Sequence, residues 1–397
     1  MRSLVSLRRV CGLPTVCLSS GRPAWSPPYR GNLLDARLVS TASDRTRPDT
    51  APRTPGTRHL PGASGRDGTD EGCGRRARRE EPPLIALPEV QAAAGRVAGR
   101  VRETPLLAVD PGPLAPAGRM WLKLEQAQHT GSFKARGAFN HILAARAAGR
   151  LPAAGVVAAS GGNAGLAFAY AATEVGVPAE VFVPETAPAV KVERLRALGA
   201  AVVQVGTRYA EAQEAAAKRA ADTGALPCHA YDQPEVCAGQ GTLGLEILEQ
   251  TGGEVDTVLL AVGGGGLMAG VAAALEGRAR VVGVEPEGIP TLERALAAGR
   301  PVDVPVSGVA ADSLGATRLG DIAYAVAART GVVPALVSDE AIIEARRFAW
   351  EEYRQVVEHG TAAALAALRT GAYRPAPGER VVVVLCGANT DPSDLVT

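Results

Sequence analysis

Residues 131–138 read Gly-Ser-Phe-Lys-Ala-Arg-Gly-Ala, a polar turn that leads into an amphipathic helical pattern. The lysine of this stretch, Lys134, is one of only four lysines among the 42 lysine and arginine residues of the chain. A guanidinium stays protonated and cannot form an imine, so a lysine kept in such an arginine-rich chain indicates a position that needs a nucleophilic amine. A solvated surface lysine is the alternative that this residue alone leaves open.

The composition predicts a globular body behind an unusual leading segment. With 397 residues, 46% of them hydrophobic, the chain can bury a sizeable core in two or three domains. The net charge of +1 gives no reason to expect a nucleic-acid or membrane partner, and no run reaches the roughly 18 to 20 apolar residues that span a bilayer. Residues 1–80 hold 15 arginines and seven acidic residues, whereas residues 81–397 hold 27 basic and 34 acidic residues.

The leading segment, residues 1–80, is predicted to be a disordered extension, because it contains eight prolines and no sustained apolar periodicity. Its first forty residues are rich in Arg and Ser, with Asp35 as their acidic residue, which is the composition of an organellar transit peptide. An unstructured extension or an over-early start codon is the favoured alternative, because the arginine bias runs through the whole chain. We therefore expect a cytoplasmic protein, with an organellar matrix as the other location.

The cysteines of the body argue against both a disulfide framework and a zinc site. Cys228, Cys237 and Cys386 are odd in number and have no CxxC spacing. The setting is therefore expected to be reducing.

The body shows a repeating strand-and-helix rhythm, in which continuous apolar runs predict strands covered on both faces of parallel sheets. We expect residues 155–233 to form a small α/β domain inserted into a larger domain made of residues 84–154 and 234–397. The predicted strands cover residues 120–125, 155–160, 181–184, 201–205, 257–262, 281–284 and 381–385. The predicted helices cover residues 84–102, 138–148, 164–175, 190–198, 209–221, 242–249, 267–275, 291–298 and 339–354.

Residues 263–267, here called the glycine loop, follow a predicted strand and open a helix. Consecutive glycines let backbone amides converge on an anion at the positive end of the helix, so a phosphate is the expected occupant. The alternative is a dinucleotide fold, since Gly264-x-Gly266-x-x-Ala269 fits a relaxed fingerprint and Glu285 stands where a ribose-binding acid would. We favour the single phosphate, because the dinucleotide leaves Lys134 without a role.

Two further turns carry polar or reactive groups at the ends of predicted strands. Residues 160–163, Ser-Gly-Gly-Asn, here called the serine turn, offer a helix N-terminus, a hydroxyl and an amide to a carboxylate. Their alternative role is to cap the following helix. Cys386, which ends the last predicted strand, can approach a ring nitrogen without imposing a positive charge, although a buried filler is the default for an isolated cysteine. An amine, a phosphate site, a carboxylate site and this thiol are together what a pyridoxal phosphate imine of an amino acid requires.

Four stretches in this order and spacing resemble the fold-type II pyridoxal phosphate enzymes, specifically the serine/threonine dehydratases. They are residues 131–138, the serine turn, the glycine loop and residues 386–389, Cys-Gly-Ala-Asn, and the likeness covers about residues 84–397. The resemblance implies an α/β fold of two domains, each a largely parallel sheet flanked by helices, and a homodimer. It also implies elimination of a β-hydroxyl from L-serine or L-threonine, giving a 2-oxo acid and ammonia.

The resemblance assigns roles to individual residues. Lys134 holds the cofactor as an imine and takes the α-proton of the substrate, and Phe133 packs against the ring. Asn163 bonds the 3-hydroxyl of the ring, and Cys386 faces its nitrogen. The amides of the glycine loop hold the phosphate, and Ser160, counted with Lys134 as catalytic, helps to grip the substrate carboxylate. In full, the phosphate set is Gly263, Gly264, Gly265, Gly266 and Leu267, and the carboxylate set is Ser160, Gly161, Asn163 and Ala164.

The chain also departs from its relatives. Many dehydratases have His where Ala164 stands, and members that racemise serine need a hydroxyl where this chain has Gly161, so efficient racemisation is not expected. The chain stops at Thr397, just beyond the cofactor motif, so we expect no regulatory domain. A β-replacement enzyme or a racemase on the same fold remains the closest alternative, and a nucleotide-binding, non-catalytic protein is the alternative from another class.

Relatives also bind a cation through a glutamate that the resemblance places at Glu246. The aspartate that a divalent site adds six residues later is Gly252 here, so a monovalent cation is expected. An ordinary helix charge is the equal alternative for Glu246.

Overall fold

A computed structural model describes residues 85–395, apart from positions 113 and 117. The predictions for residues 1–84 lie outside the described residues. Within the described ranges, no helix is both long enough and apolar enough to span a bilayer.

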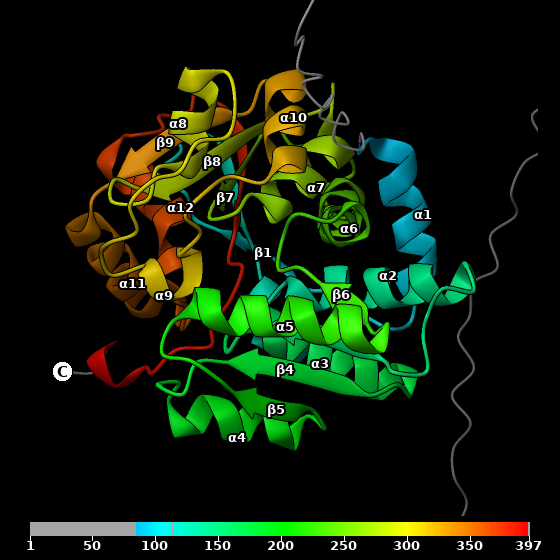
Figure 1. Ribbon diagram of the computed structural model, residues 1–397. Helices are drawn as coiled ribbons and strands as arrows, with labels where there is room; N and C mark the ends of the chain where they lie inside the picture. The colour runs from blue at the N-terminus through cyan, green and yellow to red at the C-terminus, as the bar shows by residue number, and fades with distance from the viewer. Residues whose placement is uncertain (1–84, 113, 117, 396–397) are drawn as a thin grey trace, which may run out of the picture. The chain divides into compact units, whose positions relative to one another are not determined.

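A six-stranded sheet forms the centre of the larger layer, with the strand order β1-β2-β10-β7-β8-β9 (Figure 1). All its pairings are parallel except that of β1 with β2. The inner strands are apolar runs with buried side chains, as expected where helices cover both faces. The strands are β1 (Leu106–Val109), β2 (Arg119–Lys123), β7 (Thr257–Ala261), β8 (Arg280–Pro286), β9 (Val333–Val337) and β10 (Arg380–Val384).

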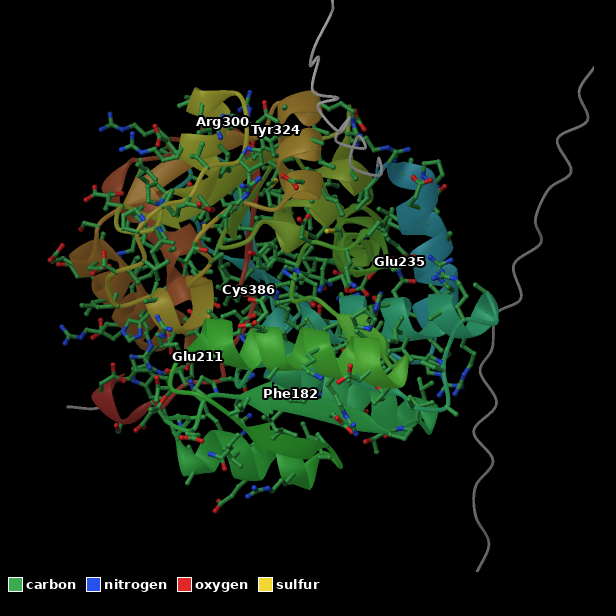
Figure 2. The ribbon with its side chains drawn as sticks, in the orientation of Figure 1. Phe182, Glu211, Glu235, Arg300, Tyr324 and Cys386 are labelled. Carbon is green, nitrogen blue, oxygen red and sulfur yellow. The ribbon has the colours of Figure 1, made fainter. Side chains whose placement is uncertain are left out.

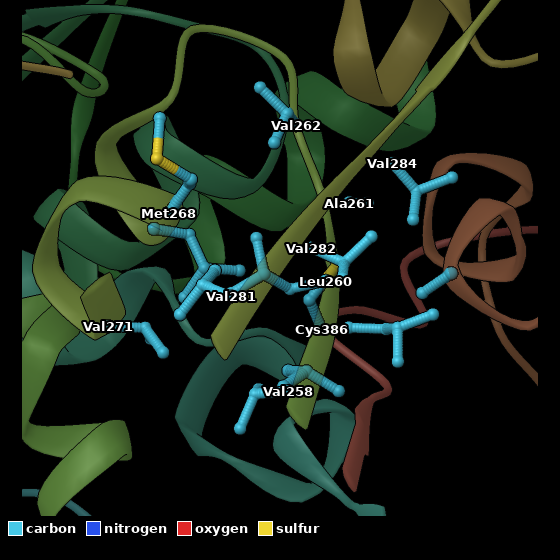
Figure 3. Packing of buried hydrophobic residues seen from close by; sticks show 14 of the residues in the cluster. Val258, Leu260, Ala261, Val262, Met268, Val271, Val281, Val282, Val284 and Cys386 are labelled. Carbon is cyan, nitrogen blue, oxygen red and sulfur yellow. The ribbon is translucent and has the colours of Figure 1, made fainter. Parts of the chain in front are cut away.

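Helices pack against this sheet in two groups. Contacts join α1 to α6, α6 to α7 and α7 to α10, while α12 packs on α11 and contacts β7, β8 and β9. Val258, Val282 and Met268 belong to the core of this layer, and Cys386 lies in the same core (Figure 3). The helices are α1 (Leu87–Val97), α6 (Pro234–Gln250), α7 (Gly266–Leu275), α8 (Thr291–Ala298), α9 (Ala311–Leu314), α10 (Asp321–Thr330), α11 (Asp339–Tyr353) and α12 (His359–Thr370).

A second, four-stranded sheet is parallel throughout and has the order β5-β4-β3-β6. Its helix α5 shares a small core with the sheet, in which Ala212 and Ala216 meet Val157 and Phe182. The helix α2 contacts both α3 and α6 and so connects the two layers. The elements are α2 (Lys134–Ala147), β3 (Val156–Ala159), α3 (Asn163–Val175), β4 (Ala179–Val183), α4 (Ala189–Ala197), β5 (Ala201–Gln204), α5 (Tyr209–Thr223) and β6 (Leu226–Cys228).

The α/β class with largely parallel sheets is confirmed. The division into a small and a large domain stays a prediction, although all strands of the second sheet come from residues 156–228. Two helices begin earlier than expected: α2 at Lys134 itself, and α6 at Pro234, because proline suits the first helical turn.

The sequence analysis missed β1, β6, β9, α9, α10 and α12. The edge strands β6 and β9 contain Pro227 and Pro334, which weaken a strand pattern and which a sheet tolerates at its edge. The helix α12 is alanine-rich and buried from Gly360 to Leu368, so it shows no clear amphipathic period.

Candidate active site

The turn that carries Lys134 is held against the end of β10. The Phe133 amide donates to the Cys386 carbonyl at 3.1 Å, and the Ala388 amide donates to the Gly131 carbonyl at 3.0 Å. Figure 2 labels Cys386, which follows β10 in the middle of the molecule in this view. Two predicted site motifs that are far apart in the sequence are therefore side by side.

Lys134 is the first residue of α2, and its amine has no carboxylate partner within hydrogen-bonding distance among the described residues. The Nζ atom donates to the Ala230 carbonyl at 2.7 Å and lies 4.9 Å from the centroid of the Phe133 ring. Desolvation lowers the pKa of Lys134 to about 8. A substantial fraction of this amine is thus neutral near physiological pH, as a nucleophile or base requires.

The glycine loop follows β7 and lies beside the segment that contacts Lys134. A Cβ atom at Gly264 would stand 2.3 Å from the Tyr231 ring, and one at Gly266 would stand 2.7 Å from the Tyr231 carbonyl oxygen. Gly265 has a φ of +87°, a conformation that favours glycine. Because Tyr231 follows Ala230 in the chain, the loop and the lysine are brought close together. The helix α7 begins at Gly266 with no side-chain cap among the described residues, as an anion site at its N-terminus requires.

Cys386 is buried and stays a neutral thiol. Its Sγ lies 3.1 Å from the Thr361 hydroxyl, which also donates to the Gly387 carbonyl at 3.0 Å. Burial raises the pKa of Cys386 to about 12. These surroundings suit the predicted uncharged partner of a ring nitrogen.

The serine turn forms a compact structure at the end of β3. The Ser160 hydroxyl accepts from the Gly162 amide at 3.2 Å, and α3 begins at Asn163, with Ala164 buried behind it. Gly161 and Gly162 line a pocket. The turn thus exposes a helix start where the sequence predicts the substrate carboxylate.

Both the nitrogen and the oxygen of the Asn163 side-chain amide form hydrogen bonds. Its Nδ2 donates to the two Glu358 carboxylate oxygens at 2.9 and 3.1 Å, and its Oδ1 accepts from Asn389 Nδ2 at 2.6 Å. The backbone N–H of Asn389 also donates to the Glu358 carboxylate, at 2.8 Å, so the three residues form one network. Desolvation raises the pKa of Glu358, which is only 5% exposed.

Sequence analysis did not single out Glu358, Thr361 or Tyr231. Glu358 and Thr361 stand at the start of α12, whose helical pattern was itself missed, and Tyr231 lies in a short connection between β6 and α6. Asn389 belongs to a recognised motif, but nothing in the sequence gave its side chain a partner.

Glu246 lies in a buried ionic network rather than among the groups around Lys134. Its carboxylate accepts from Lys123 Nζ at 2.8 Å and from Arg136 Nη1 at 2.6 Å, and Arg136 also pairs with Glu125 at 2.7 Å. No group of three or more His, Cys, Asp or Glu residues in the described ranges is placed to hold a metal ion. These contacts favour the helix-charge alternative, and the monovalent cation at Glu246 stays a prediction without support from them.

Glu285, the acid required by the dinucleotide alternative, is fully buried and engaged elsewhere. It accepts from the Thr291 hydroxyl at 2.8 Å and from the amides of Leu292 and Glu293 at 2.6 and 3.0 Å. A ribose could not reach these oxygens without breaking the start of α8.

Parallel sheets, a desolvated lysine beside a glycine loop at a helix N-terminus, and a neutral thiol are the features of a pyridoxal phosphate enzyme of fold type II. The chain belongs to the family described as pyridoxal-phosphate dependent enzymes, whose family model matches residues 97–387. Pyridoxal phosphate is accordingly its cofactor, and the predicted resemblance is confirmed.

Proteins similar to this chain are named for several different activities. The chain is 35% identical to an L-threonine ammonia-lyase of Thermotoga maritima over 78% of this chain and 76% of that protein. It is 37% identical to a phenylserine dehydratase of Ralstonia pickettii, over 77% and 94% of the two chains. Maize serine racemase has a similar structure, with a TM-score of 0.73, 30% identity, and coverage of 79% and 96%.

Proposed function

We propose that the protein is a lyase that deaminates L-threonine or L-serine by α,β-elimination. The observation that carries this proposal is the amine of Lys134, which has a pKa of about 8 and no carboxylate partner beside it in the described structure. The threonine ammonia-lyase similar to this chain supports the reaction class. The similar phenylserine dehydratase and serine racemase leave the substrate and the competing activity to experiment.

The residues present fit the cofactor. The amides of the glycine loop would hold the phosphate, Asn163 the 3-hydroxyl, Phe133 the ring face and Cys386 the ring nitrogen. When bound, pyridoxal phosphate supplies a sink for the electron pair that the broken Cα–H bond leaves behind.

Residues of the chain would bind the substrate carboxylate and accept the α-proton. The carboxylate of the substrate would be gripped by Ser160, Gly161, Asn163 and Ala164, at the positive end of α3. The neutral Lys134 amine accepts the α-proton, and the Cβ–O bond breaks with loss of water. The enamine that elimination leaves becomes an imine when a proton moves from its nitrogen to Cβ, and hydrolysis of this imine releases ammonia and leaves a 2-oxo acid.

Racemisation is the alternative that the serine turn makes testable. At Gly161 the chain offers no hydroxyl on the face opposite Lys134, so we expect elimination to dominate. The assay incubates the purified holoprotein with L-serine and L-threonine and measures ammonia, 2-oxo acid and D-amino acid together. Ammonia and 2-oxo acid in equal amounts support the proposal, whereas D-serine as the main product would replace it with a racemase.

We further propose that the protein is a cytoplasmic homodimer with the small and large domains given above. Light scattering of the purified protein tests the dimer, since a monomeric mass at micromolar concentration would contradict it.

A further inference from the structure

The amine of Lys123 is surrounded by oxygen atoms in the way that a bound cation is. Its Nζ atom donates to the Thr104 carbonyl at 2.7 Å and to Glu246 Oε2 and Gln250 Oε1 at 2.8 Å each. The oxygen of the Gln250 amide faces this amine because its nitrogen donates to the Thr104 carbonyl at 3.0 Å and to Glu103 at 3.1 Å. Lys123 is fully buried, so these three oxygens stand in place of a hydration shell.

These contacts require the charged form of the amine. Desolvation lowers the pKa of Lys123, while Glu246 and Glu125 oppose that shift. An ammonium group has three N–H donors and a neutral amine only two, and three acceptors lie within hydrogen-bonding distance of this nitrogen. A positive charge therefore lies among the three oxygens.

The Glu246 carboxylate has no acceptor position left for a metal cation. Its Oε1 atom accepts from Arg136 Nη1 at 2.6 Å. Its Oε2 atom accepts from Lys123 Nζ and Arg136 Nη2 at 2.8 Å each, and from the Thr104 amide at 3.4 Å. A carboxylate offers about four lone-pair sites, and these four N–H donors use them.

The charges of this buried cluster also balance without an added ion. Arg136 forms hydrogen bonds of 2.7 and 2.8 Å to Glu125 as well as its pair with Glu246. Lys123 and Arg136 thus supply two positive charges, and Glu125 and Glu246 supply two negative charges. A further cation would bring an uncompensated charge into a buried position, which is strongly unfavourable.

We propose that the Lys123 ammonium takes the position that a monovalent cation would otherwise occupy beside Glu246, so that this protein binds no metal ion there. A side chain of the chain itself then replaces the cation that the resemblance predicts. The inference goes beyond the proposed elimination reaction and does not depend on it. Arg136 lies on α2 two residues after Lys134, so the same charge cluster helps to fix the start of the helix that carries the proposed reactive lysine.

The position suits a large monovalent ion once the lysine side chain is removed. The three oxygens lie 2.7 to 2.8 Å from Nζ, farther than the roughly 2.3 to 2.6 Å of calcium contacts or the roughly 2.0 to 2.1 Å of magnesium contacts. Potassium and ammonium ions have the matching size and charge. Lys123→Ala therefore opens a site that potassium can enter, whereas in Lys123→Met a longer, uncharged side chain fills the same space.

The test compares potassium chloride with tetramethylammonium chloride at equal ionic strength, since the tetramethylammonium ion is too large for this position. Thermal unfolding of the holoprotein is measured in the wild type, in Lys123→Ala and in the matched control Lys123→Met. We expect the unfolding midpoint of the wild type to be the same in both salts. Potassium should raise the midpoint of Lys123→Ala by roughly 2 °C or more, and further as its concentration rises, and should leave that of Lys123→Met unchanged.

A second measurement does not require Lys123→Ala to fold. Rubidium, which has the charge of potassium and nearly its size, is dialysed against the wild-type and Glu246→Gln holoproteins, and the bound rubidium is measured by mass spectrometry. We expect equal amounts in the two proteins. Rubidium that the wild type binds and Glu246→Gln loses would overturn the proposal, and so would an unfolding midpoint of Lys123→Ala that potassium does not raise. Either result would leave the proposed function standing, because the ammonia assay tests that function separately.

Discussion

The amines of Lys123 and Lys134 are both desolvated, yet their surroundings differ in kind. Lys123 is fully buried, and its amine donates to Glu246, Gln250 and the Thr104 carbonyl, so its charge is compensated. The Lys134 amine meets a carbonyl and an aromatic ring instead. The difference teaches that, within the described structure, this protein pairs its structural lysine with a carboxylate and leaves the lysine proposed to be reactive without one, which favours a neutral amine there.

The largest effect is expected from Lys134→Ala. Removing the amine should lower ammonia release by on the order of 10⁴-fold or more, because no other group can take over its role. The absorbance of the bound cofactor should disappear as well, while the thermal unfolding profile stays close to that of the wild type. The exposed Lys218, replaced in the same way, serves as the control and should leave both readouts unchanged. Retained turnover in Lys134→Ala would contradict the proposed mechanism.

The converse substitution tests the structural lysine. Lys123→Met should lower the free energy of unfolding by about 3 kcal/mol, because it breaks a buried ionic network. Below its unfolding temperature the variant should still bind the cofactor and release ammonia. Lys218→Met, which breaks an exposed pair with Asp222, should cost no more than about 0.5 kcal/mol in denaturant titrations. Equal losses in the two variants would show that Lys123 contributes no more than a surface pair.

The lowered pKa of Lys134 should be visible in the rate at which the cofactor-free protein takes up its cofactor. Only the neutral amine attacks an aldehyde, so the rate at which cofactor-free protein combines with pyridoxal phosphate should rise with pH. The midpoint should fall near pH 8, where Lys134 loses its proton, and not near the ordinary lysine value of 10.5. Stopped-flow absorbance across pH 6 to about 10 measures the profile. A rate that shows no midpoint near pH 8 and is still rising steeply at the upper end of this range would mean that desolvation does not lower the pKa of this amine.

A smaller effect is expected from Glu358→Gln. Glu358 Oε1 accepts from both Asn163 Nδ2 and the Asn389 backbone amide, so the glutamine oxygen can keep these two bonds. The nitrogen of the glutamine amide cannot accept, so the second bond from Asn163 Nδ2, to Oε2, is lost and two donors face each other there. We expect the affinity for pyridoxal phosphate to fall roughly tenfold. Because burial raises the pKa of Glu358, replacing it with a neutral side chain should not reduce stability. Spectroscopic titration measures the affinity, with the exposed Glu352→Gln as control. An unchanged affinity would show that this network does not orient Asn163.

Chemistry restricts the residue type at some positions of the proposed site, and a single sequence predicts those positions. An imine requires a lysine, and close approach of the backbone requires glycine at Gly264 and Gly266, so these positions carry a signal even in a single sequence. Parallel strands were likewise predictable, because strands covered on both faces become apolar runs, as in β7 and β10.

The remaining parts depend on contacts between elements that are distant in sequence. Glu358 orients Asn163 across nearly two hundred residues of chain, and Arg136 joins Glu246 to Glu125. Glutamate and arginine are common surface residues, so their types alone gave no hint of burial or pairing. Glu246 illustrates the point, since only the fold shows that its carboxylate already pairs with Lys123 and Arg136.

The proposed function depends most directly on which amine forms the bond to the cofactor. The holoprotein can be reduced with borohydride, digested and analysed by mass spectrometry, and the chain offers only Lys123, Lys134, Lys191 and Lys218 as sites. We predict a pyridoxyl group on Lys134 in the peptide that contains Phe133. A pyridoxyl group on any of the other three lysines, with Lys134 unmodified, would contradict the proposed role of Lys134.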